Sequence, residues 1–524
     1  MIMRDRKDLV WIAAASTLIL VWGTIPTWAG YRLETETLRF RGLYFDSQDY
    51  AVHIAMMQAG MHGEWAYQLK FTTETHEPAY IRMFYVVLGH ISRWIGLPAE
   101  LTFQLARWAL GFLALFALYR LMRRVFADPF WARTAFLLAA LGSGVGWLQL
   151  ILHPAPGAIT PIDFWLIDAY VFFSLSLFPH FAFVTAALCN VLSLWLDFLE
   201  DGGWTRIAWI GLACVLVQFV NPIALVVVDA GLFGATLFAW WKLAEIHRQD
   251  LAALLAVAVT QVPLLAYNFI ILNNDPLWSR FTAQNQTLSP PPGYYLWGFA
   301  LFWPAAILGT GAALRTKSHP LAAAAFWILS AFLLAYSPFP IQRRFLQNIT
   351  VPLAILAAAG LIRLFELAAA RNPGMLRWRF SAVSLFVFLA SISSIQMAPG
   401  QAYYLQTHPQ DLYYPAALDD ARAWFRENAR YNDFVLASEE TSQVIAQKAG
   451  MRVYLGHEME TLGHQTKEEN VQAFFQGQLP ELATGPVKWV LYGPLERQSN
   501  PDFRPGDQLE LVYDVPELQI YRVK

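Results

Sequence analysis

Eleven separate stretches of mostly apolar residues constrain this sequence of 524 residues more than any other feature. A helix needs about 20 such residues to cross a lipid bilayer. The stretches lie at 9–30, 101–119, 130–152, 181–199, 204–220, 222–241, 251–272, 294–313, 319–336, 345–367 and 380–399. Only 15% of the residues are charged, against about 25% in soluble proteins. The sequence therefore predicts a mainly α, polytopic membrane protein with about eleven transmembrane helices.

Charged residues are concentrated at the C-terminal end. Of the 125 residues from 400 to 524, 29 are charged with a net charge of −7, whereas residues 1–399 carry 47 charges and a net +5. The last long apolar stretch ends at the same point, so we divide the chain into a transmembrane domain, 1–399, and an extracytoplasmic domain, 400–524. With a net charge of −2 for the whole chain, we expect no nucleic-acid partner.

The C-terminal segment alternates between helix-type and strand-type patterns. Helices are predicted at 415–429, 440–449 and 467–477, and strands at 433–437, 451–455, 487–492, 509–513 and 517–522. These patterns predict a small α/β domain, in which the sequence contains no recognised catalytic motif.

Basic residues in four short loops predict the orientation. They are Arg120, Arg123, Arg124 and Arg133, then Lys242 and Arg248, then Arg315 and Lys317, then Arg371, Arg377 and Arg379. Because short basic loops face the cytoplasm, the N-terminus is expected inside and the C-terminal domain outside.

If residues 79–95 crossed the membrane, the loop from Arg120 to Arg133 would lie outside. The predicted orientation therefore requires that this segment does not cross. Arg82, His90 and Arg93 recur at helical spacing there, which favours an amphipathic helix lying at the membrane interface. Residues 31–100 then form one large external loop, and further external segments are expected at 153–180, 273–293 and 337–344.

The first external loop opens with a polar group at a predicted helix start. Asp46, Asp49 and His53 can share one face of a helix. A carboxylate near the lipid surface is partly desolvated, which raises its pKa and suits a general base. The alternative is that Asp46 caps the helix while Asp49 is solvated.

Further along the same loop, His76 and Glu77 precede Pro78. They could bind sugar hydroxyls or a metal, but Pro78 and Glu77 also suit the first turn of a helix, and spacing alone favours that structural interpretation.

Ionisable residues recur in two other external segments. Asp163, Asp168 and His180 lie in an otherwise apolar stretch, where they must pair, face a water-filled cavity or lie among lipid headgroups. Arg343 and Arg344 are adjacent in a short loop that the orientation places outside. Two guanidinium groups suit the oxygens of a phosphate, either of a substrate or of a lipid headgroup.

Together these features resemble the class C (GT-C) integral-membrane glycosyltransferases, such as the protein O-mannosyltransferases and the aminoarabinose transferase of lipid A. The resemblance is carried by the loop from Asp46 to His53, the His76-Glu77-Pro78 turn, the interfacial helix, the span ending at 119–126, and Arg343-Arg344-Phe345. In the C-terminal segment, 452–457 with Glu460 and Thr461 resembles uncharacterised bacterial relatives, and this second resemblance implies no chemistry.

The resemblance implies transfer of a sugar, with inversion, from a polyprenyl-phosphate donor to an acceptor hydroxyl on the outer face of the membrane. The acceptor could be a glycan, a lipid or a protein. Asp49, or alternatively Asp46, is implied as the base, and Arg343 and Arg344 as ligands of the lipid phosphate.

The remaining substrate-binding candidates are His53, His76, Glu77, Asp163 and His180. Some relatives bind a divalent metal at an acidic pair and others need none, so metal use stays open; no other cofactor is expected.

Two other functions stay open from the residues. A transporter or flippase of lipid-linked sugars would need functional charges at mid-membrane and repeated halves, for which Asp229 is weak support. A non-catalytic membrane-anchored binding protein would bind its partner through the C-terminal segment alone.

Overall fold

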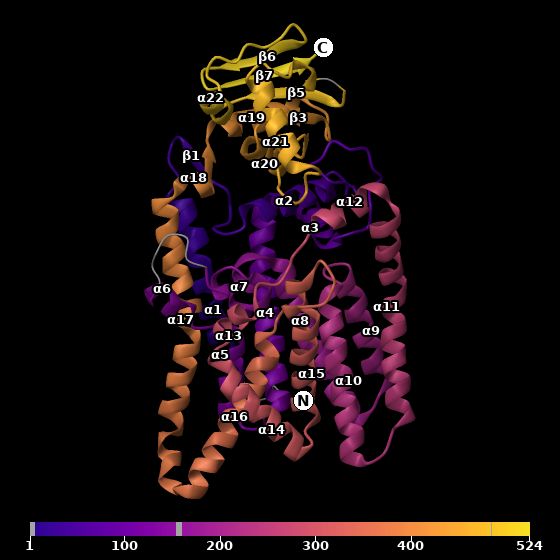
Figure 1. The fold of residues 1–524 in the computed structure, drawn as a ribbon, viewed down its shortest axis with the longest axis vertical. Coiled ribbons are helices and arrows are strands. Elements are labelled where there is room, and N and C mark those ends of the chain that lie inside the picture. Colours follow the sequence, from indigo (N-terminus) through magenta and orange to yellow (C-terminus); the bar gives the residue numbers. More distant parts are fainter. Residues whose placement is uncertain (1–5, 153–159, 484) are drawn as a thin grey trace. The chain divides into compact units, whose positions relative to one another are not determined.

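The protein divides into two compact units. The computed structural model describes residues 6–152, 160–483 and 485–524 (Figure 1). The membrane unit comprises Met1–Ile25, Leu105–Tyr267 and Gln286–Gly400, and the loop–tail unit comprises Pro26–Gln104, Asn268–Asn285 and Gln401–Lys524. The C-terminal segment is therefore grouped with the first loop, whereas the boundary between residues 399 and 400 stays a prediction.

Helices cover all eleven predicted stretches. They are α1 (Arg6–Arg32), α4 (Ala99–Val125), α5 (Pro129–Leu141), α6 (Gly146–Leu152), α8 (Pro179–Asp201), α9 (Trp204–Gln218), α10 (Ile223–Leu243), α11 (Arg248–Asn274), α13 (Pro292–Gly298), α14 (Phe302–Thr316), α15 (His319–Leu334), α16 (Thr350–Arg371) and α17 (Arg379–Thr407). Shorter elements connect them: η1 (Ile162–Phe164), η2 (Ile167–Ala169), α7 (Val171–Leu177), η3 (Gln342–Leu346) and η4 (Pro373–Trp378).

By length and composition, seven helices in the described part of the chain can cross a membrane, or nine if each of two bent pairs is one span. The bent pairs are α5 with α6, at 50°, and α13 with α14, at 86°. Two more predicted spans, α9 and α15, form apolar helices of 15 and 16 residues. The mainly α, polytopic class is confirmed, and the two broken spans were not foreseen.

The two breaks lie against each other. The backbone N–H of Val145 donates to the carbonyl of Trp297 at 3.3 Å, which joins the two bends. A Cβ at Gly144 would lie 2.4 Å from the carbonyl oxygen of Gly298. Only glycine permits backbones to approach this closely, so Gly144 fixes where the bends meet.

Glycine also allows α14 and α16 to cross in close contact. A Cβ at Gly309 would lie 1.9 Å from the carbonyl oxygen of Leu356, and one at Gly360 would lie 1.9 Å from that of Ala305. Small residues at a crossing let membrane helices maximise van der Waals contact, because lipid gives little hydrophobic driving force between them.

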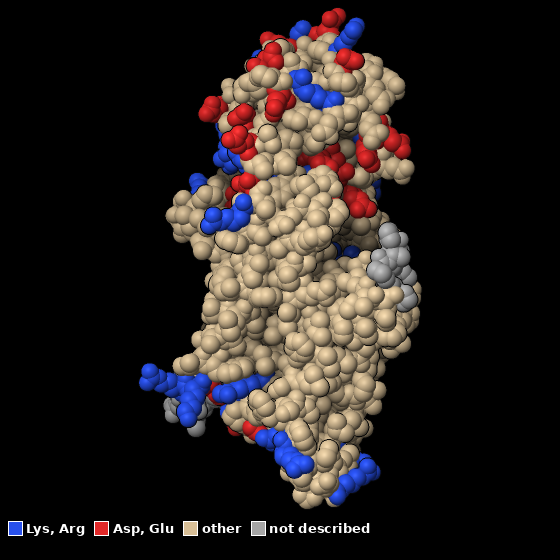
Figure 2. Space-filling view, turned by 90° about the vertical axis from the view of Figure 1, so that its left-hand side faces the viewer, with Lys and Arg blue, Asp and Glu red and all other residues tan. Residues whose placement is uncertain are grey.

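The four basic loops lie at the same end of the membrane unit, where Figure 2 shows blue side chains beyond a long tan surface. Lys317 donates to the carbonyl of Trp241 at 3.5 Å, which joins the second and third loops. The guanidinium of Arg379 lies 4.8 Å from the ring of Phe130, which joins the fourth loop to the first. The predicted orientation requires this grouping, because it places all four basic loops on the same side of the membrane.

The loop–tail unit contains two helices from the first loop, one from the 273–293 segment and a C-terminal α/β fold. Its helices are α2 (Ser47–Met61), α3 (Met83–Ile95), α12 (Pro276–Gln284), α18 (Pro409–Leu412), α19 (Ala417–Asn428), α20 (Glu439–Ala449), α21 (His464–Phe475), η5 (Pro480–Leu482) and α22 (Pro494–Ser499). The helix predicted from residue 79 begins at Met83, so Pro78 lies outside its first turn.

A five-stranded sheet forms the centre of the C-terminal fold, in the order β4-β3-β5-β7-β6. Its strands are β3 (Phe434–Leu436), β4 (Arg452–Val453), β5 (Val487–Tyr492), β6 (Leu509–Val515) and β7 (Leu518–Val523). β3 is parallel to β4 and β5, while β7 is antiparallel to β5 and β6. Every predicted strand and helix of the α/β segment is present.

The first loop and the C-terminal segment are hydrogen-bonded through a second, two-stranded sheet. β1 (Leu38–Phe40) pairs antiparallel with β2 (Tyr413–Pro415), with Phe40 opposite Tyr413. Within the loop, α2 and α3 cross at Gly60 and Gly89, whose Cβ positions would lie about 2 Å from backbone oxygens of the other helix. The helix that carries Asp49 is therefore held tightly in this unit.

Candidate functional site

Asp49 lies in the first turn of α2, where the exposed N–H groups of the helix favour a negative charge. Its carboxylate is 45% exposed, and it lies 3.2 Å from Nε2 of His457, a residue of the C-terminal segment whose side chain is only 5% exposed. The carboxylate therefore has one buried partner and keeps access to solvent.

The hydrogen bonds around His457 assign its proton. Nδ1 accepts the backbone N–H groups of Met459, at 3.0 Å, and of Glu460, at 3.2 Å. A nitrogen that accepts two N–H groups has no proton of its own, so the proton of the neutral ring lies on Nε2 and is donated to Asp49.

A second ion pair lies beside the first. The guanidinium of Arg82 pairs with the carboxylate of Glu460, whose side chain is 2% exposed. Arg82 has a φ of 55°, and Asp46, before α2, has a φ of 54°. Arg82 and Asp46 both lie near the carboxylate of Asp49. Two non-glycine residues in the left-handed region at one site indicate backbone strain that the surrounding contacts maintain.

The electrostatics of Asp49 differ from the expectation. Burial alone would raise the pKa of Asp49, but the hydrogen bond from His457 and the electrostatic effect of the nearby Arg82 and His53 outweigh it and lower the pKa below its ordinary value. Asp49 is thus ionised at neutral pH, and the predicted rise in its basicity is wrong.

Two effects on His457 oppose each other. Burial lowers the pKa of His457, while the carboxylates of Asp49, Glu460 and Asp46 raise it, with a net rise. A second proton would have to sit on Nδ1 and would displace the two backbone N–H groups there. The hydrogen-bond pattern decides for the neutral ring, which donates from Nε2.

Asp46 and His53 lie close to this pair. The Asp46 side chain makes no capping bond to α2, so the predicted cap is not formed. The His53 ring stacks on Tyr85 with centroids 4.0 Å apart. Of the predicted first-loop residues, the structure brings together Asp46, Asp49 and His53.

His76 and Glu77 do not join this group. Nε2 of His76 accepts the N–H of Leu69 at 2.9 Å, and Nδ1 lies 2.8 Å from the carbonyl of Glu74. Both ring nitrogens thus form hydrogen bonds with backbone groups of the loop itself. The side chain of Glu77 is exposed and lies outside any helix, so it does not start one, and its ligand role stays a prediction.

In the membrane unit, Arg343 and Arg344 lie in the short helix η3. The Arg343 guanidinium lies 5.4 Å from the ring centre of Trp165, and its backbone N–H donates to Thr287 at 3.0 Å. Within the described residues no ion pair joins Arg343 to a carboxylate. Its charge is half-buried and available to an anion.

Asp163 and His180 also lie in the membrane unit, where each contacts a neighbouring group of the protein. The Asp163 side chain is buried and accepts the N–H of Gly146 at 3.1 Å, at the start of α6. Burial raises the pKa of Asp163. His180 lies in the first turn of α8, its ring 4.0 Å from that of Phe181. Asp163 therefore fastens the bend before α6, and a substrate role for either residue stays a prediction.

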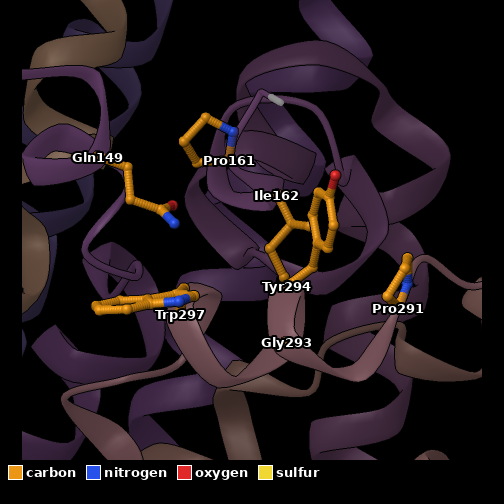
Figure 3. A pocket seen from close by; sticks show the side chains of 7 residues that line it. All are labelled: Gln149, Pro161, Ile162, Pro291, Gly293, Tyr294 and Trp297. Atoms are coloured by element: carbon orange, nitrogen blue, oxygen red, sulfur yellow. The ribbon is translucent and has the colours of Figure 1, made fainter. Parts of the chain in front are cut away.

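A cavity of about 290 Å³ opens beside the two helix bends (Figure 3). It is lined by Gln149, Pro161, Ile162, Pro291, Gly293, Tyr294 and Trp297. The aromatic side chains of Tyr294 and Trp297 border it, and Gln149 contributes an amide group. Such an apolar lining with few polar groups is typical of a site for an organic ligand or a lipid chain.

The residues around Asp49 do not fit a divalent metal. Neither unit brings together three or more His, Cys, Asp or Glu side chains as metal ligands, as far as the structure describes the chain. Nε2 of His457, 3.2 Å from the Asp49 carboxylate, carries a proton, and the neighbouring Arg82 is a cation. A hard divalent metal needs several oxygen donors instead.

Sequence reasoning missed His457 and Glu460, although both lie in the segment 452–461 that it singled out. The only available signal was a histidine and an acid within a short turn between predicted elements. Nothing in the local pattern indicates that this turn contacts residues about 400 positions earlier.

Comparisons with known proteins find similarity in structure alone. No family model matches the chain, and no curated protein matches it in sequence. The archaeal oligosaccharyltransferase AglB from Archaeoglobus fulgidus, in complex with an inhibitory peptide and a dolichol-phosphate, matches with a TM-score of 0.54 at 14% identity, over 94% of this chain and 70% of that one.

Two further solved structures match over nearly the whole chain. ArnT from Cupriavidus metallidurans, bound to undecaprenyl phosphate, has a TM-score of 0.54 at 12% identity, covering 98% of this chain and 97% of that one. The arabinofuranosyltransferase AftD from Mycobacteria has a TM-score of 0.52 at 13% identity, covering 98% of this chain but 41% of its own. All three are GT-C glycosyltransferases. The chain is an integral membrane protein with the fold of the GT-C glycosyltransferases.

Proposed function

We propose that this protein is an inverting glycosyltransferase, which moves a sugar from a polyprenyl-phosphate donor to an acceptor hydroxyl on the outer face of the membrane. The observation that carries the proposal is Asp49: an ionised, partly exposed carboxylate at the start of the first-loop helix, in a chain with the GT-C fold. The N-terminus is proposed to be cytoplasmic and the loop–tail unit extracytoplasmic.

In the proposed reaction, the carboxylate of Asp49 accepts the proton of the acceptor hydroxyl. The hydroxyl oxygen bonds to the anomeric carbon from about 3–3.5 Å in a near-attack arrangement. The bond from that carbon to the phosphate oxygen breaks, and the phosphate keeps the electron pair. Because the pKa of Asp49 is lowered, it is a weak base, so the hydroxyl loses its proton late, once its oxygen has begun to bond to carbon.

Arg343 is the proposed ligand of the donor phosphate, with Arg344 as its neighbour. The half-buried guanidinium, fixed against Trp165, can donate two parallel hydrogen bonds to phosphate oxygens and stabilise the charge that develops on the leaving group. The apolar cavity beside Tyr294 and Trp297 fits a segment of the donor's hydrocarbon chain. No step requires a metal.

The test is transfer by the purified protein in nanodiscs, from a panel of radiolabelled polyprenyl-phosphate sugars. Asp49→Asn, which preserves shape but removes the base, should reduce kcat about 10²- to 10⁴-fold. Asp46→Asn is the matched control on the same turn and should retain most activity. Full transfer by Asp49→Asn would refute the base assignment, and if Asp46→Asn alone were inactive the role would pass to Asp46.

The donor assignment has its own test. Arg343→Gln should raise KM for the donor about 10-fold or more, as expected for loss of a charged hydrogen bond, with a smaller change in KM for the acceptor. An unchanged donor KM would remove Arg343 from phosphate binding. Translocation of the lipid-linked sugar across liposomes without transfer would instead support a flippase.

A further inference from the structure

We propose that His457, in the C-terminal segment, is a positioning residue for Asp49, so that the α/β fold completes the site instead of only accompanying it. This inference rests on the proposed function for what Asp49 does. The two residues are separated by 408 positions in the chain, and their side chains meet at 3.2 Å within the loop–tail unit.

The turn that carries His457 is built to hold the ring. The hydroxyl of Thr461 accepts the N–H groups of Gly456 and His457, both at 3.2 Å, and the N–H of Thr461 donates back to the carbonyl of His457 at 2.9 Å. Because two backbone N–H groups donate to Nδ1, the ring can neither flip nor change its tautomer. The N–H of Nε2 therefore points at Asp49.

The same turn is fastened to two other segments. Glu460 pairs with Arg82, immediately before α3. From the end of α12, the side-chain amide of Gln284 donates to the carbonyl of Thr461 at 2.8 Å, and that of Asn285 donates to the carbonyl of Met459 at 3.0 Å. The turn thus joins the first loop and the 273–293 segment around one carboxylate.

The charged and titratable groups that face this pair come from three elements. His457 faces Asp49 and Asp46 at the start of α2, and Glu460 in its own turn. Asp49 faces His457, His53 on α2 and Arg82 before α3. A donated hydrogen bond favours the ionised carboxylate, so removal of His457 raises the pKa of Asp49 and makes the site need a higher pH to act as a base.

A positioning role differs measurably from a merely structural one. In the transfer assay, His457→Ala should lower kcat about 10- to 100-fold with little change in KM, the scale of a lost hydrogen bond to a charged group. The acidic limb of the pH profile of kcat/KM should also move to higher pH by about one unit. His457→Gln, whose amide nitrogen can replace Nε2 as a donor, should recover most of both losses.

The matched control is His464→Ala in the same segment. His464 also pairs with a carboxylate, Glu439, at 3.2 Å, but lies outside the site. It should leave the pH profile unchanged. If His457→Ala does not accumulate, His457→Phe keeps a ring beside Phe71 while removing the hydrogen bond, and carries the same expectation.

The failure of this inference can be distinguished from the failure of the proposed function. If Asp49→Asn abolishes transfer while His457→Ala keeps the wild-type pH profile and loses less than about 3-fold in kcat, the positioning role is overturned and the function stands. If Asp49→Asn transfers normally, the function itself falls. Independently of turnover, a double-mutant cycle of Asp49→Asn and His457→Ala on thermal unfolding should give non-additive shifts, and strict additivity would contradict the contact.

Discussion

The two units of the protein are held together in different ways. The membrane unit packs apolar helices, with glycine crossings such as Gly309 against α16, and several of its ion pairs lie among the basic loops at one end. The loop–tail unit joins segments hundreds of residues apart through buried or half-buried charges. These pairs are Arg41 with Glu440, Arg82 with Glu460, His457 with Asp49, and Lys467 with Glu74. A fifth pair, Lys70 with Glu64, lies within the first loop itself.

The two kinds of packing differ in the chemistry that they offer. Apolar packing fixes helices but offers little chemistry, whereas buried charges are stable only when each has its partner. The unit built from such pairs is the one that contains the candidate base. We therefore expect its stability to depend on single partners and on pH, and the stability of the glycine helix crossings in the membrane unit to depend on neither.

The largest effect should come from breaking a buried pair. Arg82→Met leaves the carboxylate of Glu460, 2% exposed, without its partner, which should destabilise the loop–tail unit by about 3 kcal/mol. We take the lower end of the range for buried pairs because Arg82 is itself 31% exposed. Hydrogen exchange of the backbone at 456–461, followed by mass spectrometry, would measure it.

The control for this prediction is an exposed pair in the same unit. Arg522 and Glu510 lie 3.8 Å apart and are both more than half exposed, so Arg522→Met should cost about 0.5 kcal/mol or less. Equal protection in both variants would contradict the claim that buried pairs hold this unit.

The next effect tests the membrane unit. In Gly309→Ala the new methyl group would lie 1.9 Å from the carbonyl oxygen of Leu356, so α14 and α16 must separate, at a cost of about 2 kcal/mol. Gly311→Ala, on the same helix with nothing within 4 Å, should be neutral or slightly stabilising. Thermal unfolding in detergent at two pH values would show whether the loss of stability is independent of pH. A loss that changed with pH would contradict the difference that we infer between the two units.

This contrast also explains what the sequence could predict. Apolar length and helical or strand periodicity are local properties, so all eleven stretches and the elements of the α/β segment follow from the pattern. The bends near Gly144 and Gly298 depend on one backbone meeting another. The partner of Asp49 depends on a turn about 400 residues away, and no local spacing encodes such a contact.

A smaller effect concerns the pH dependence of the loop–tail unit. Lys70 is fully buried, and burial lowers its pKa to about 7, although Glu64 partly opposes this. Between about pH 7 and 10.5 the unfolded chain holds a proton on this amine that the folded chain lacks, so the stability of the unit rises with pH across that window. The rise should approach about 1 kcal/mol per pH unit.

Lys70→Met removes this contribution. Its unfolding temperature should therefore change less with pH across the window than that of the wild type, because other groups titrate equally in both proteins. Lys488→Met, at an exposed position on β5, is the matched control and should follow the wild type. If Lys70→Met kept the full wild-type slope, the amine would have to be protonated in the fold despite its burial.

The smallest effect is expected from metal removal, which acts on the site around Asp49. The loop–tail unit surrounds Asp49 with the N–H of His457 and the charge of Arg82, so the carboxylate already has the positive partners that a cation would otherwise supply. Treatment with EDTA followed by desalting should therefore leave transfer within about 2-fold of its starting rate, with no gain on adding Mg²⁺ or Mn²⁺. Loss of transfer that Mg²⁺ or Mn²⁺ restored would mean that Asp49 exchanges His457 for a metal during turnover. In that case His457→Gln should change the metal concentration needed for half-maximal rate, and the unit's ion pairs would be a resting state of the site.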